Sequence, residues 1–475
     1  MIEINPYLFR NYDIRGAEPE YVKSETIIPG SLRAKSAYAC PLTKEIAYAI
    51  GRAVAQVFKF KRMAVGGDIR RTTPMLKKGI IQGLLDGGID VTDIGLSSTD
   101  MLYFAIGYYN FEGGIQVTAS HTIKELNGFK ISRLMPDGNV FPVGIGSGME
   151  ELRDAAIKQE FEDKEKGNLT TKAVLLDFCN FIRNIVDAGS FKHFKIVMDP
   201  GNGCGGFIAK ELFKDMNVDI IPLNFEPDGE FPVHNPNPAL VENRKEVSEK
   251  IKETNADLGI MWDGDSDRVC FLDENGEFIP NDFVTAVLSE WVIEKHPNAR
   301  IIYTVPMSWS IPEKVAKLGG ISEMTPVGNT FVKQAMHNHN AVFGGEQAGH
   351  YMFKETFNAE TGFLPVLIIL DRLTRNNKKM SELFSEYTNN FFLSGDTNIE
   401  IKNSDLVLKK LEEHYSDATN KYRLDGLSIE YPDWHFNARP SSNDPVIRLN
   451  IEAKNRDLML AKQEEIKGLV KEYDK

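Results

Sequence analysis

The stretch Ile115–Lys130, which reads I-Q-V-T-A-S-H-T-I-K-E-L-N-G-F-K, decides how the fold of this chain is interpreted. Ile115 and Val117 alternate with other residues in a way that predicts a buried strand. Small and polar residues follow, so we expect Ser120 and His121 in a loop at the carboxyl end of this strand. Open α/β sheets present their reactive groups at that end. A Ser-His pair alone also fits an ordinary capping pair, so its function depends on the rest of the chain.

Strands and helices alternate on both sides of this stretch, and a helix is expected from Leu42 onward. The other expected strands include Met63–Val65, Ile89–Ile94, Lys195–Met198, Asp257–Trp262 and Arg300–Val305, and the expected helices include Thr99–Tyr109, Asp282–Glu294, Ile311–Leu318 and Thr361–Arg375. This alternation predicts mostly parallel sheets covered by helices on both faces. The glycine-rich loop Asp199–Gly206 lacks G-x-G-x-x-G spacing, so we interpret it as structural.

The character of the chain changes around Lys378–Asn390, which we interpret as a linker. The remaining residues read as helix, strand, strand, strand and helix, which is a small α+β unit. The predicted fold is therefore α/β with four domains: three similar mixed α/β sheet domains and a smaller C-terminal α+β domain. Their expected boundaries are 1–160, 161–275, 276–382 and 383–475.

Composition describes a globular protein of 475 residues, with 42% hydrophobic and 26% charged residues. The net charge of -13 disfavours nucleic acid as a partner. The longest apolar run, Phe363–Leu370, is far shorter than the roughly 20 residues of a membrane span, so no membrane partner is expected. No signal peptide is evident, and the four cysteines lack C-x-x-C spacing, which argues against disulfides and zinc. We therefore expect a cytoplasmic protein.

Three carboxylates alternate with small residues in Asp263-Gly-Asp-Ser-Asp267, which directly follows an expected strand. Asp263, Asp265 and Asp267 converge only if the chain curls, and Gly264 permits a curl. Ligands that are all oxygen select a hard cation, and three carboxylates leave room for a phosphate oxygen, which favours Mg²⁺ over Zn²⁺. Ca²⁺ or a plain solvated turn fits the same residues. The preceding strand and the following Arg268 favour a metal site.

The setting of Ser120 favours phosphoryl transfer over acyl transfer, because the chain has no G-x-S-x-G motif around it. A nearby Mg²⁺ would stabilise charge on the transferring phosphoryl group. His121 and Lys130 are candidates for proton transfer. An exposed amine is the plain alternative for Lys130.

Other polar groups suit a phosphorylated sugar. Glu346 and His350, four residues apart in a glycine-bracketed loop, offer an acceptor and a switchable donor for vicinal hydroxyls. Arg439 and Arg448 with Ser441 and Ser442 form a reasonable dianion clamp. Arg10 and Arg15 flank a Tyr-Asp pair, and their guanidiniums either hold a phosphate or form a structural Arg-Asp pair. Together these groups describe a phosphosugar enzyme.

The motifs F-R-N-Y-D-I-R-G (9–16), T-A-S-H-x5-N-G-F-K (118–130), D-G-D-S-D-R (263–268), G-E-Q-A-G-H (345–350) and R-P-S-S-N-D-P-V-I-R (439–448) occur in this order over the whole chain. By these motifs and their order, the chain resembles the α-D-phosphohexomutases, and most of all their bacterial phosphomannomutase/phosphoglucomutase branch. The resemblance implies a four-domain molecule around a central cleft, whose domains carry in turn the phosphoserine, metal-binding, sugar-recognition and phosphate-binding loops.

The resemblance also implies a role for each site residue. Ser120 would carry the phosphate and, with Asp263, Asp265 and Asp267, hold Mg²⁺. His121 and Lys130 would transfer protons, and Arg15 and Arg268 would belong to the catalytic centre. The substrate-binding residues would be Tyr12, Glu346, His350, Arg439, Ser441, Ser442, Asn443 and Arg448.

The implied reaction is a reversible phosphoryl transfer between C1 and C6 of a hexose phosphate, through phosphoserine and a 1,6-bisphosphate. The resemblance implies glucose 1,6-bisphosphate or mannose 1,6-bisphosphate as the activator, mannose phosphate as the favoured substrate and glucose phosphate as the second. We expect a monomer or a homodimer.

Some positions depart from the family pattern and keep other functions open. Thr122-Ile123 replaces the usual Asn-Pro, Ala348 replaces a Ser, and 442–444 read Ser-Asn-Asp. The alternatives are a phosphoglucosamine mutase, suggested by Glu346-Gln347, a metal-dependent sugar phosphatase that uses the first Asp of the 263–267 loop, and a sugar-phosphate-binding paralogue without turnover.

Overall fold

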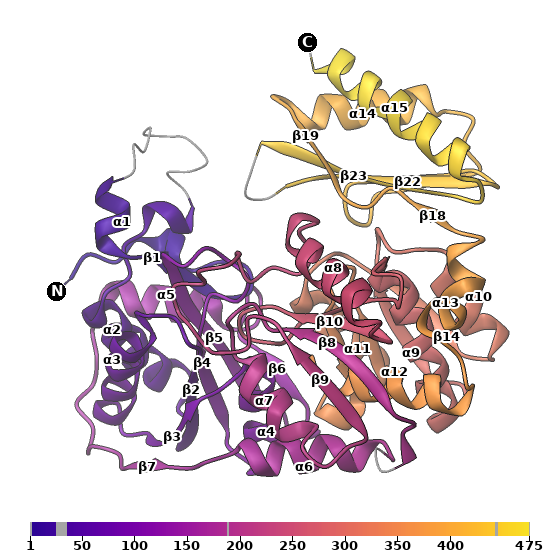
Figure 1. Ribbon diagram of the computed structural model, residues 1–475. Coiled ribbons are helices and arrows are strands. Elements are labelled where there is room, and N and C mark those ends of the chain that lie inside the picture. The colour runs from indigo at the N-terminus through magenta and orange to yellow at the C-terminus, as the bar shows by residue number, and fades with distance from the viewer. Residues whose placement is uncertain (1, 25–35, 188–189, 442–444, 475) are drawn as a thin grey trace. The chain divides into compact units, whose positions relative to one another are not determined.

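The computed structural model describes residues 2–24, 36–187, 190–441 and 445–474 (Figure 1). The chain packs into two compact units. The first unit comprises Met1–Ile279 and Ala348–Ser381, and the second comprises Pro280–Gln347 and Glu382–Lys475.

The first sheet of the first unit has seven strands in the order β1-β5-β4-β2-β3-β7, with β6 paired to β5. They are β1 (Ile14–Ala17), β2 (Arg62–Gly67), β3 (Asp90–Leu96), β4 (Gly113–Val117), β5 (Leu126–Leu134), β6 (Val140–Pro142) and β7 (Leu169–Thr171). Strands β7, β3, β2 and β4 are parallel, which confirms the parallel core. Strands β5, β1 and β6 add an antiparallel edge, which brings Lys130 on β5 opposite Gln116 on β4.

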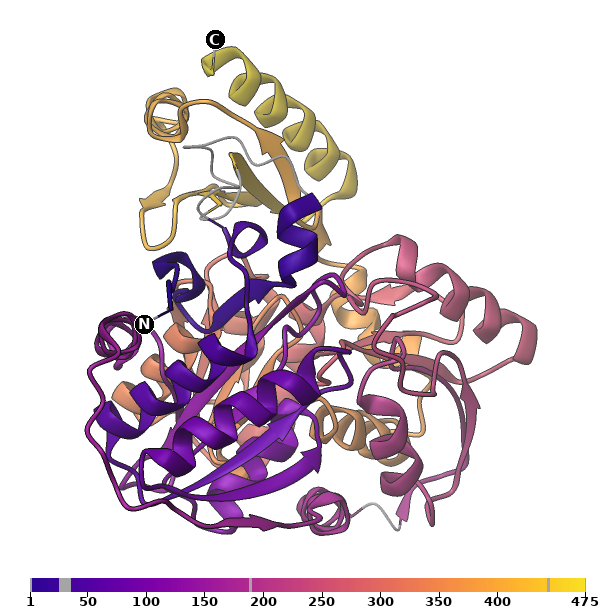
Figure 2. The same ribbon diagram turned by 90° about the vertical axis from the view of Figure 1, so that its left-hand side faces the viewer.

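Helices cover both faces of this sheet, as expected (Figure 2). Ile115 and Val117 pack into a core shared with α2 (Lys44–Phe58), α3 (Thr73–Asp86) and α5 (Met149–Lys158). The opposite face receives α4 (Thr99–Tyr108), where Gly114 leaves room for Leu102 and Ile106. The predicted strand at 115–117 is therefore confirmed, with its buried side chains anchored in the core.

The second sheet has the order β12-β11-β10-β8-β9. Its elements are β8 (Phe194–Asp199), β9 (Val218–Pro222), β10 (Leu258–Trp262), β11 (Val269–Leu272), β12 (Phe278–Ile279), α6 (Leu175–Ile185), α7 (Gly205–Leu212) and α8 (Lys245–Thr254). The loop between β10 and β11 carries the three aspartates. A Cβ at Gly203 would lie 2.5 Å from the carbonyl oxygen of Gly264, so the glycine-rich loop is structural, as expected. It packs against the aspartate loop.

The rest of the first unit consists of short elements and one buried helix. It contains α1 (Pro19–Ser24), the antiparallel pair β16 (Tyr351–Phe353) and β17 (Ala359–Glu360), and α12 (Leu364–Arg375). The short 3-10 helices of the described chain are η1 (Pro6–Leu8), η3 (Ala37–Ala39), η5 (Glu242–Arg244) and η6 (Lys354–Thr356). Residues 364–370 on α12 are all buried, so the apolar run of the sequence lies in a core helix.

The second unit contains three parallel strands and a separate antiparallel sheet. The parallel strands are β13 (Arg300–Thr304), β14 (Ile321–Thr325) and β15 (Phe343–Gly345), with α9 (Asn281–Lys295), α10 (Ser310–Lys317) and α11 (Asn329–His339). The antiparallel sheet contains β18 (Phe392–Leu393), β19 (Thr397–Glu400), β20 (Asn420–Tyr422), β21 (Leu427–Glu430), β22 (Trp434–Pro440) and β23 (Val446–Ala453). Helices α14 (Ser404–His414) and α15 (Arg456–Tyr473) cover its apolar face (Figure 1).

Two expectations about the C-terminal part are wrong. The supposed linker contains α13 (Met380–Thr388), because Met380, Phe384 and Tyr387 recur at helical spacing and are buried. The terminal sheet has six strands where three were expected, because β18 has only two residues and β19 and β20 are short and mostly polar. Among the helices that the structure describes, none is long and apolar enough to cross a membrane.

Candidate active site

Ser120 lies three residues beyond the end of β4 and is only 2% exposed. Its hydroxyl donates to Oδ2 of Asp263 at 2.7 Å, and Nδ1 of His121 lies 3.1 Å from the same Oγ. Ser120 has φ +53°, a left-handed conformation that is unfavourable for a residue with a Cβ. The predicted strand-end loop therefore presents Ser120 to the aspartate loop.

Asp263, Asp265 and Asp267 converge as predicted, since one oxygen of each lies within 4.8 Å of the others. All three side chains are fully buried. Oδ1 of Asp265 has no hydrogen-bond partner among the described residues, which is costly for a buried carboxylate unless a cation binds it. Burial and the charges of Asp265 and Asp267 raise the pKa of Asp263 to about 7. The donor set, all oxygen and rich in charge, fits a hard divalent cation such as Mg²⁺.

The curl of this loop has a different origin from the one expected. The left-handed residue is Ser266, at φ +60°, and not Gly264. Gly264 is needed for close approach, because a Cβ there would lie 2.8 Å from the carbonyl oxygen of Ser120. The glycine therefore lets the aspartate loop (residues 263–268) touch the serine loop (residues 118–126).

Lys130 points from β5 into the same cluster. Its Nζ lies 2.7 Å from Oδ2 of Asp265, forms a second ion pair with Asp267, and is 3.5 Å from Oγ1 of Thr99. Burial lowers the pKa of Lys130, but the three carboxylates outweigh this effect and raise it above its ordinary value. Lys130 is therefore a charged group whose side chain is only 13% exposed, and not an exposed amine.

His350 and Arg268 complete the wall beside Asp267. Nε2 of His350 lies 3.0 Å from Nε of Arg268 and 3.2 Å from Oδ1 of Asp267. Burial would raise the pKa of Asp267, but Lys130 and His350 hold it well below its ordinary value. Burial and the nearby Arg268 and Arg15 lower the pKa of His121 well below its usual range. His121 is therefore neutral, as a proton acceptor must be.

Arg15 lies on β1, which pairs with β5 so that Arg15 is opposite Gly128, two residues from Lys130. It forms an ion pair with Asp13, and its buried Nε has no hydrogen-bond partner in the described chain. Tyr12 lies just before β1 and is partly buried. The structure thus places Arg15 near the cluster through the strand register.

Glu346 belongs to the second unit, whereas His350 belongs to the first. The carboxylate of Glu346 accepts from the N–H of Gly328 at 3.1 Å, and Glu346 is 4% exposed. The loop before α11 and the end of β15 therefore meet at Glu346, which holds a carboxylate beside a backbone turn.

Arg439 and Arg448 are direct cross-strand partners in the antiparallel pair β22 and β23. Nε of Arg448 is buried and has no hydrogen-bond partner in the described chain. The N–H of Ser441 donates to the carbonyl of Val446 at 2.9 Å, which closes the strand end. Ser442 and Asn443, also predicted as ligands, lie outside the described residues. Two guanidiniums on one face support the predicted anion clamp.

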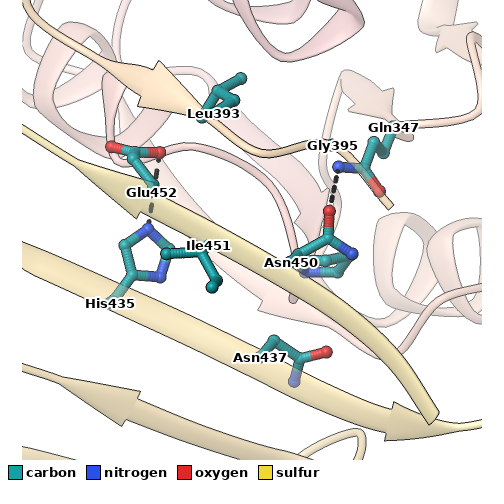
Figure 3. Close-up of a pocket in the computed structure, with 9 residues that line it drawn as sticks. Gln347, Leu393, Gly395, His435, Asn437, Asn450, Ile451 and Glu452 are labelled. Atoms are coloured by element: carbon teal, nitrogen blue, oxygen red, sulfur yellow. Dashed lines mark hydrogen bonds and ion pairs between the residues drawn. The ribbon is translucent and has the colours of Figure 1, made fainter. Parts of the chain in front are cut away.

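The same polar face of this sheet lines a pocket of the second unit (Figure 3). Gln347 donates to Asn450 at 3.0 Å, and His435 lies 3.5 Å from Glu452. Asp425, which was not predicted, accepts from the N–H of Val327 at 2.9 Å and lies 3.6 Å from Nε of Arg439. Asp425 thereby connects the clamp to the loop that precedes α11. No motif pointed to it.

Sequence reasoning also missed residues behind Ser120. Thr99 donates its hydroxyl to Asp265, and its N–H donates to the carbonyl of Asp265 at 3.0 Å. Asp68 and Arg70 follow β2 and bond to the serine loop. Because β2 is the parallel neighbour of β4, its carboxyl end is the signal that would have found them.

Comparison with known families finds three matching models, described as phosphoglucomutase/phosphomannomutase alpha/beta/alpha domains I, II and III. They match residues 31–142, 177–276 and 280–391, respectively. The antiparallel sheet from β18 onward forms the further C-terminal domain. The predicted fold class, with three α/β domains and one different C-terminal domain, is therefore confirmed.

Individual relatives span nearly the whole chain. A phosphomannomutase of Vibrio cholerae serotype O1 is 36% identical over 447 residues, which cover 91% of this chain and 96% of that protein. A phosphomannomutase of Escherichia coli is 34% identical over 474 residues, which cover 98% and 99%. The crystal structure of a phosphoglucomutase/phosphomannomutase family protein from Burkholderia thailandensis superimposes with a TM-score of 0.84 at 27% identity, covering 99% of this chain and 98% of that one.

Proposed function

The chain belongs to the phosphoglucomutase/phosphomannomutase family and is a phosphohexomutase, and from that premise we propose that it interconverts the 1- and 6-phosphates of mannose through a phosphoserine at Ser120. Glucose phosphates are the proposed second substrate. The observation that carries this proposal is the contact of 2.7 Å between Oγ of Ser120 and Asp263, because it joins a nucleophile to a buried triad of carboxylates.

Asp263, Asp265 and Asp267, with the phosphate of Ser120, are the proposed ligands of Mg²⁺. When bound, Mg²⁺ supplies positive charge that stabilises the transferring phosphoryl group and offsets the carboxylate charge that raises the pKa of Lys130. The unpartnered Oδ1 of Asp265 supports this assignment.

The reaction has two phosphoryl transfers. The C6 hydroxyl of the 1-phosphate attacks the phosphorus of phosphoserine, the bond to Oγ of Ser120 breaks, and the 1,6-bisphosphate forms. The bisphosphate then reverses its orientation in the site. Oγ of Ser120 attacks the phosphorus of the phosphate on C1, the bond between this phosphorus and the C1 oxygen breaks, and the 6-phosphate leaves. Glucose or mannose 1,6-bisphosphate activates the enzyme by phosphorylating Ser120 in the same way.

Two side chains exchange the protons. His121, neutral and 3.1 Å from Oγ, takes the proton of Ser120 when this oxygen attacks phosphorus, and the imidazolium returns that proton when Oγ leaves. Lys130 exchanges a proton with the sugar hydroxyl. Arg15 and Arg268 add positive charge, which favours a phosphoryl group with negative oxygens. The protons therefore return to their starting positions after one turnover.

Substrate recognition is assigned to the remaining polar groups. Glu346 and His350 bind sugar hydroxyls, and Tyr12 contributes to the wall of the site. The phosphate that does not react is bound by a set of five residues, namely Arg439, Ser441, Ser442, Asn443 and Arg448. The proposed domain boundaries are 1–160, 161–275, 276–382 and 383–475, and each of the four domains carries one of the loops named here.

A cytoplasmic location completes the proposal. All four cysteines are free and buried, which suits a reducing compartment.

The test is ³¹P NMR of the purified protein with Mg²⁺ and a trace of glucose 1,6-bisphosphate. Mannose 1-, glucose 1- and glucosamine 1-phosphate are the substrates, and Ser120→Ala is the control. The proposal expects fastest conversion of mannose 1-phosphate to its 6-phosphate and none by the variant. Fastest conversion of glucosamine 1-phosphate would identify a phosphoglucosamine mutase instead.

A further inference from the structure

Arg70 lies just beyond β2 and is fully buried. Its guanidinium donates to four backbone carbonyls of the serine loop. Nη2 donates to Ser120 at 2.7 Å and to Thr122 at 2.8 Å, and Nη1 donates to Ile123 at 2.7 Å and to Leu126 at 3.0 Å. One side chain therefore fixes the carbonyls along both ends of this loop.

Asp68 fixes the other side of Ser120. Its carboxylate lies 3.3 Å from Nε of Arg70 and accepts from Oγ1 of Thr118 at 2.7 Å. Thr118 in turn accepts from the N–H of Ser120 at 2.9 Å. The N–H and the carbonyl of Ser120 are thus both tied to the loop that carries Asp68 and Arg70.

The serine loop needs this support for two reasons. Ser120 has the left-handed φ of +53°, which persists in a residue with a Cβ only where the surroundings hold it. Residues 122 and 123 are Thr and Ile, so no proline ring restricts the backbone after Ser120. The four hydrogen bonds from Arg70 supply the restriction instead.

A lysine cannot replace this arrangement. Guanidinium presents five donors in one plane, whereas an ammonium presents three donors from a single atom. The four carbonyls belong to residues spread from Ser120 to Leu126 and are reached by two different nitrogens. Loss of the planar fork would release at least one carbonyl of the loop.

We propose that Arg70 is a positioning residue for phosphoryl transfer, which holds Oγ of Ser120 in the geometry that transfer requires. This inference rests on the proposed role of Ser120. Arg70 acts through the backbone and not on the substrate, because its guanidinium donates to the carbonyls of the serine loop and forms an ion pair with Asp68. Arg70 holds the carbonyl of Ser120, and Gly264 packs against the same carbonyl. A shift of Ser120 would therefore also displace the aspartate loop.

The test compares Arg70→Lys with Arg71→Lys in the full-length protein. Arg71 is the adjacent arginine, and it is 43% exposed and paired with Glu18 and Glu230. The readout is the single-turnover rate at which Ser120 takes phosphate from labelled glucose 1,6-bisphosphate, measured with kcat, KM and the thermal unfolding midpoint.

Arg70→Lys should slow the transfer and kcat by about 100-fold, the cost of a misplacement near 1 Å, with KM changed less than about threefold. Arg71→Lys should stay within about twofold of wild type, because exposed ion pairs contribute little. If Arg70→Lys does not fold, Thr118→Val decides, since it frees the N–H of Ser120 and should also lower kcat with little change in KM.

A folded Arg70→Lys protein that transfers phosphate at the wild-type rate would overturn the inference and leave the proposed function standing. So would a Thr118→Val protein with wild-type kcat, where that variant decides. A wild-type protein that transfers no phosphate to Ser120 would overturn both.

Discussion

Arg439 and Arg448 stand directly opposite each other on neighbouring antiparallel strands. Like charges in this position destabilise a sheet unless another group compensates them. Asp425, 3.6 Å from Nε of Arg439, offsets part of the charge, and Nε of Arg448 has no hydrogen-bond partner in the part of the chain that the structure describes. A bound dianion would satisfy both guanidiniums.

Arg448→Gln should therefore weaken the grip on the non-reacting phosphate. We expect KM for the hexose phosphate to rise roughly 10-fold or more, since a charge-assisted hydrogen bond contributes about 1.5–3 kcal/mol. Steady-state kinetics measures this change. Arg423→Gln is the matched control, because Arg423 is exposed and forms an ion pair with Glu412. An unchanged KM in Arg448→Gln would remove this residue from the clamp.

Asp265→Asn should abolish the stabilisation of the protein by Mg²⁺. A ligand that binds only the folded state raises its stability, and loss of one of three carboxylates weakens a hard-cation site. The unfolding midpoint, measured with and without Mg²⁺, should rise for wild type and stay constant for the variant. Asp219→Asn, at an exposed position, should respond like wild type. A variant that still responds fully to Mg²⁺ would place the metal elsewhere.

Lys130→Met should have opposite effects on catalysis and on metal binding. Loss of a proton-transfer group lowers kcat by about 10²–10⁴-fold. The ammonium of Lys130 competes for Asp265 and Asp267, so its removal should tighten Mg²⁺ binding measured by calorimetry. Weaker binding in Lys130→Met would show that the lysine supports the metal site and does not compete with it.

Asp100→Asn should flatten the pH dependence of stability in the first unit. Burial raises the pKa of Asp100 to about 8, so the folded protein holds a proton that the unfolded chain has lost above its ordinary pKa of about 3.9. The free energy of unfolding therefore falls as pH rises from about 4 to about 8, by up to about 1.4 kcal/mol per pH unit.

Hydrogen exchange of α4 between pH 5 and pH 7.5, corrected for intrinsic exchange rates, measures this effect. Wild type should lose more protection than Asp100→Asn over this range. Equal losses in the two proteins would mean that Asp100 is ionised in the fold.

Much of the fold and site could be predicted because the signals are local. Alternation at Ile115 and Val117 predicted the strand, and the strand end placed Ser120 in the loop that meets Asp263. The strand expected at 257–262 likewise placed Asp263, Asp265 and Asp267 in the loop that follows it. In each case one short segment contains the whole pattern.

Other features depend on contacts between distant segments. Arg70 is 50 residues from Ser120 in sequence, and only the parallel pairing of β2 with β4 brings them together. Met380, Phe384 and Tyr387 of α13 stand at helical spacing, but the polar residues on either side favoured a linker, and the burial of these three side chains shows the helix. The role of Gly264 could not be read from its own loop, since the carbonyl it accommodates belongs to Ser120.

The most direct test of the central claim is to locate the transferred phosphate. The protein is incubated with Mg²⁺ and glucose 1,6-bisphosphate labelled on phosphorus, and its peptides are analysed by mass spectrometry. The account predicts one labelled phosphate on Ser120, which chases into hexose phosphate when unlabelled mannose 1-phosphate is added. Label on Asp263, or isomerisation without any label on Ser120, would contradict it.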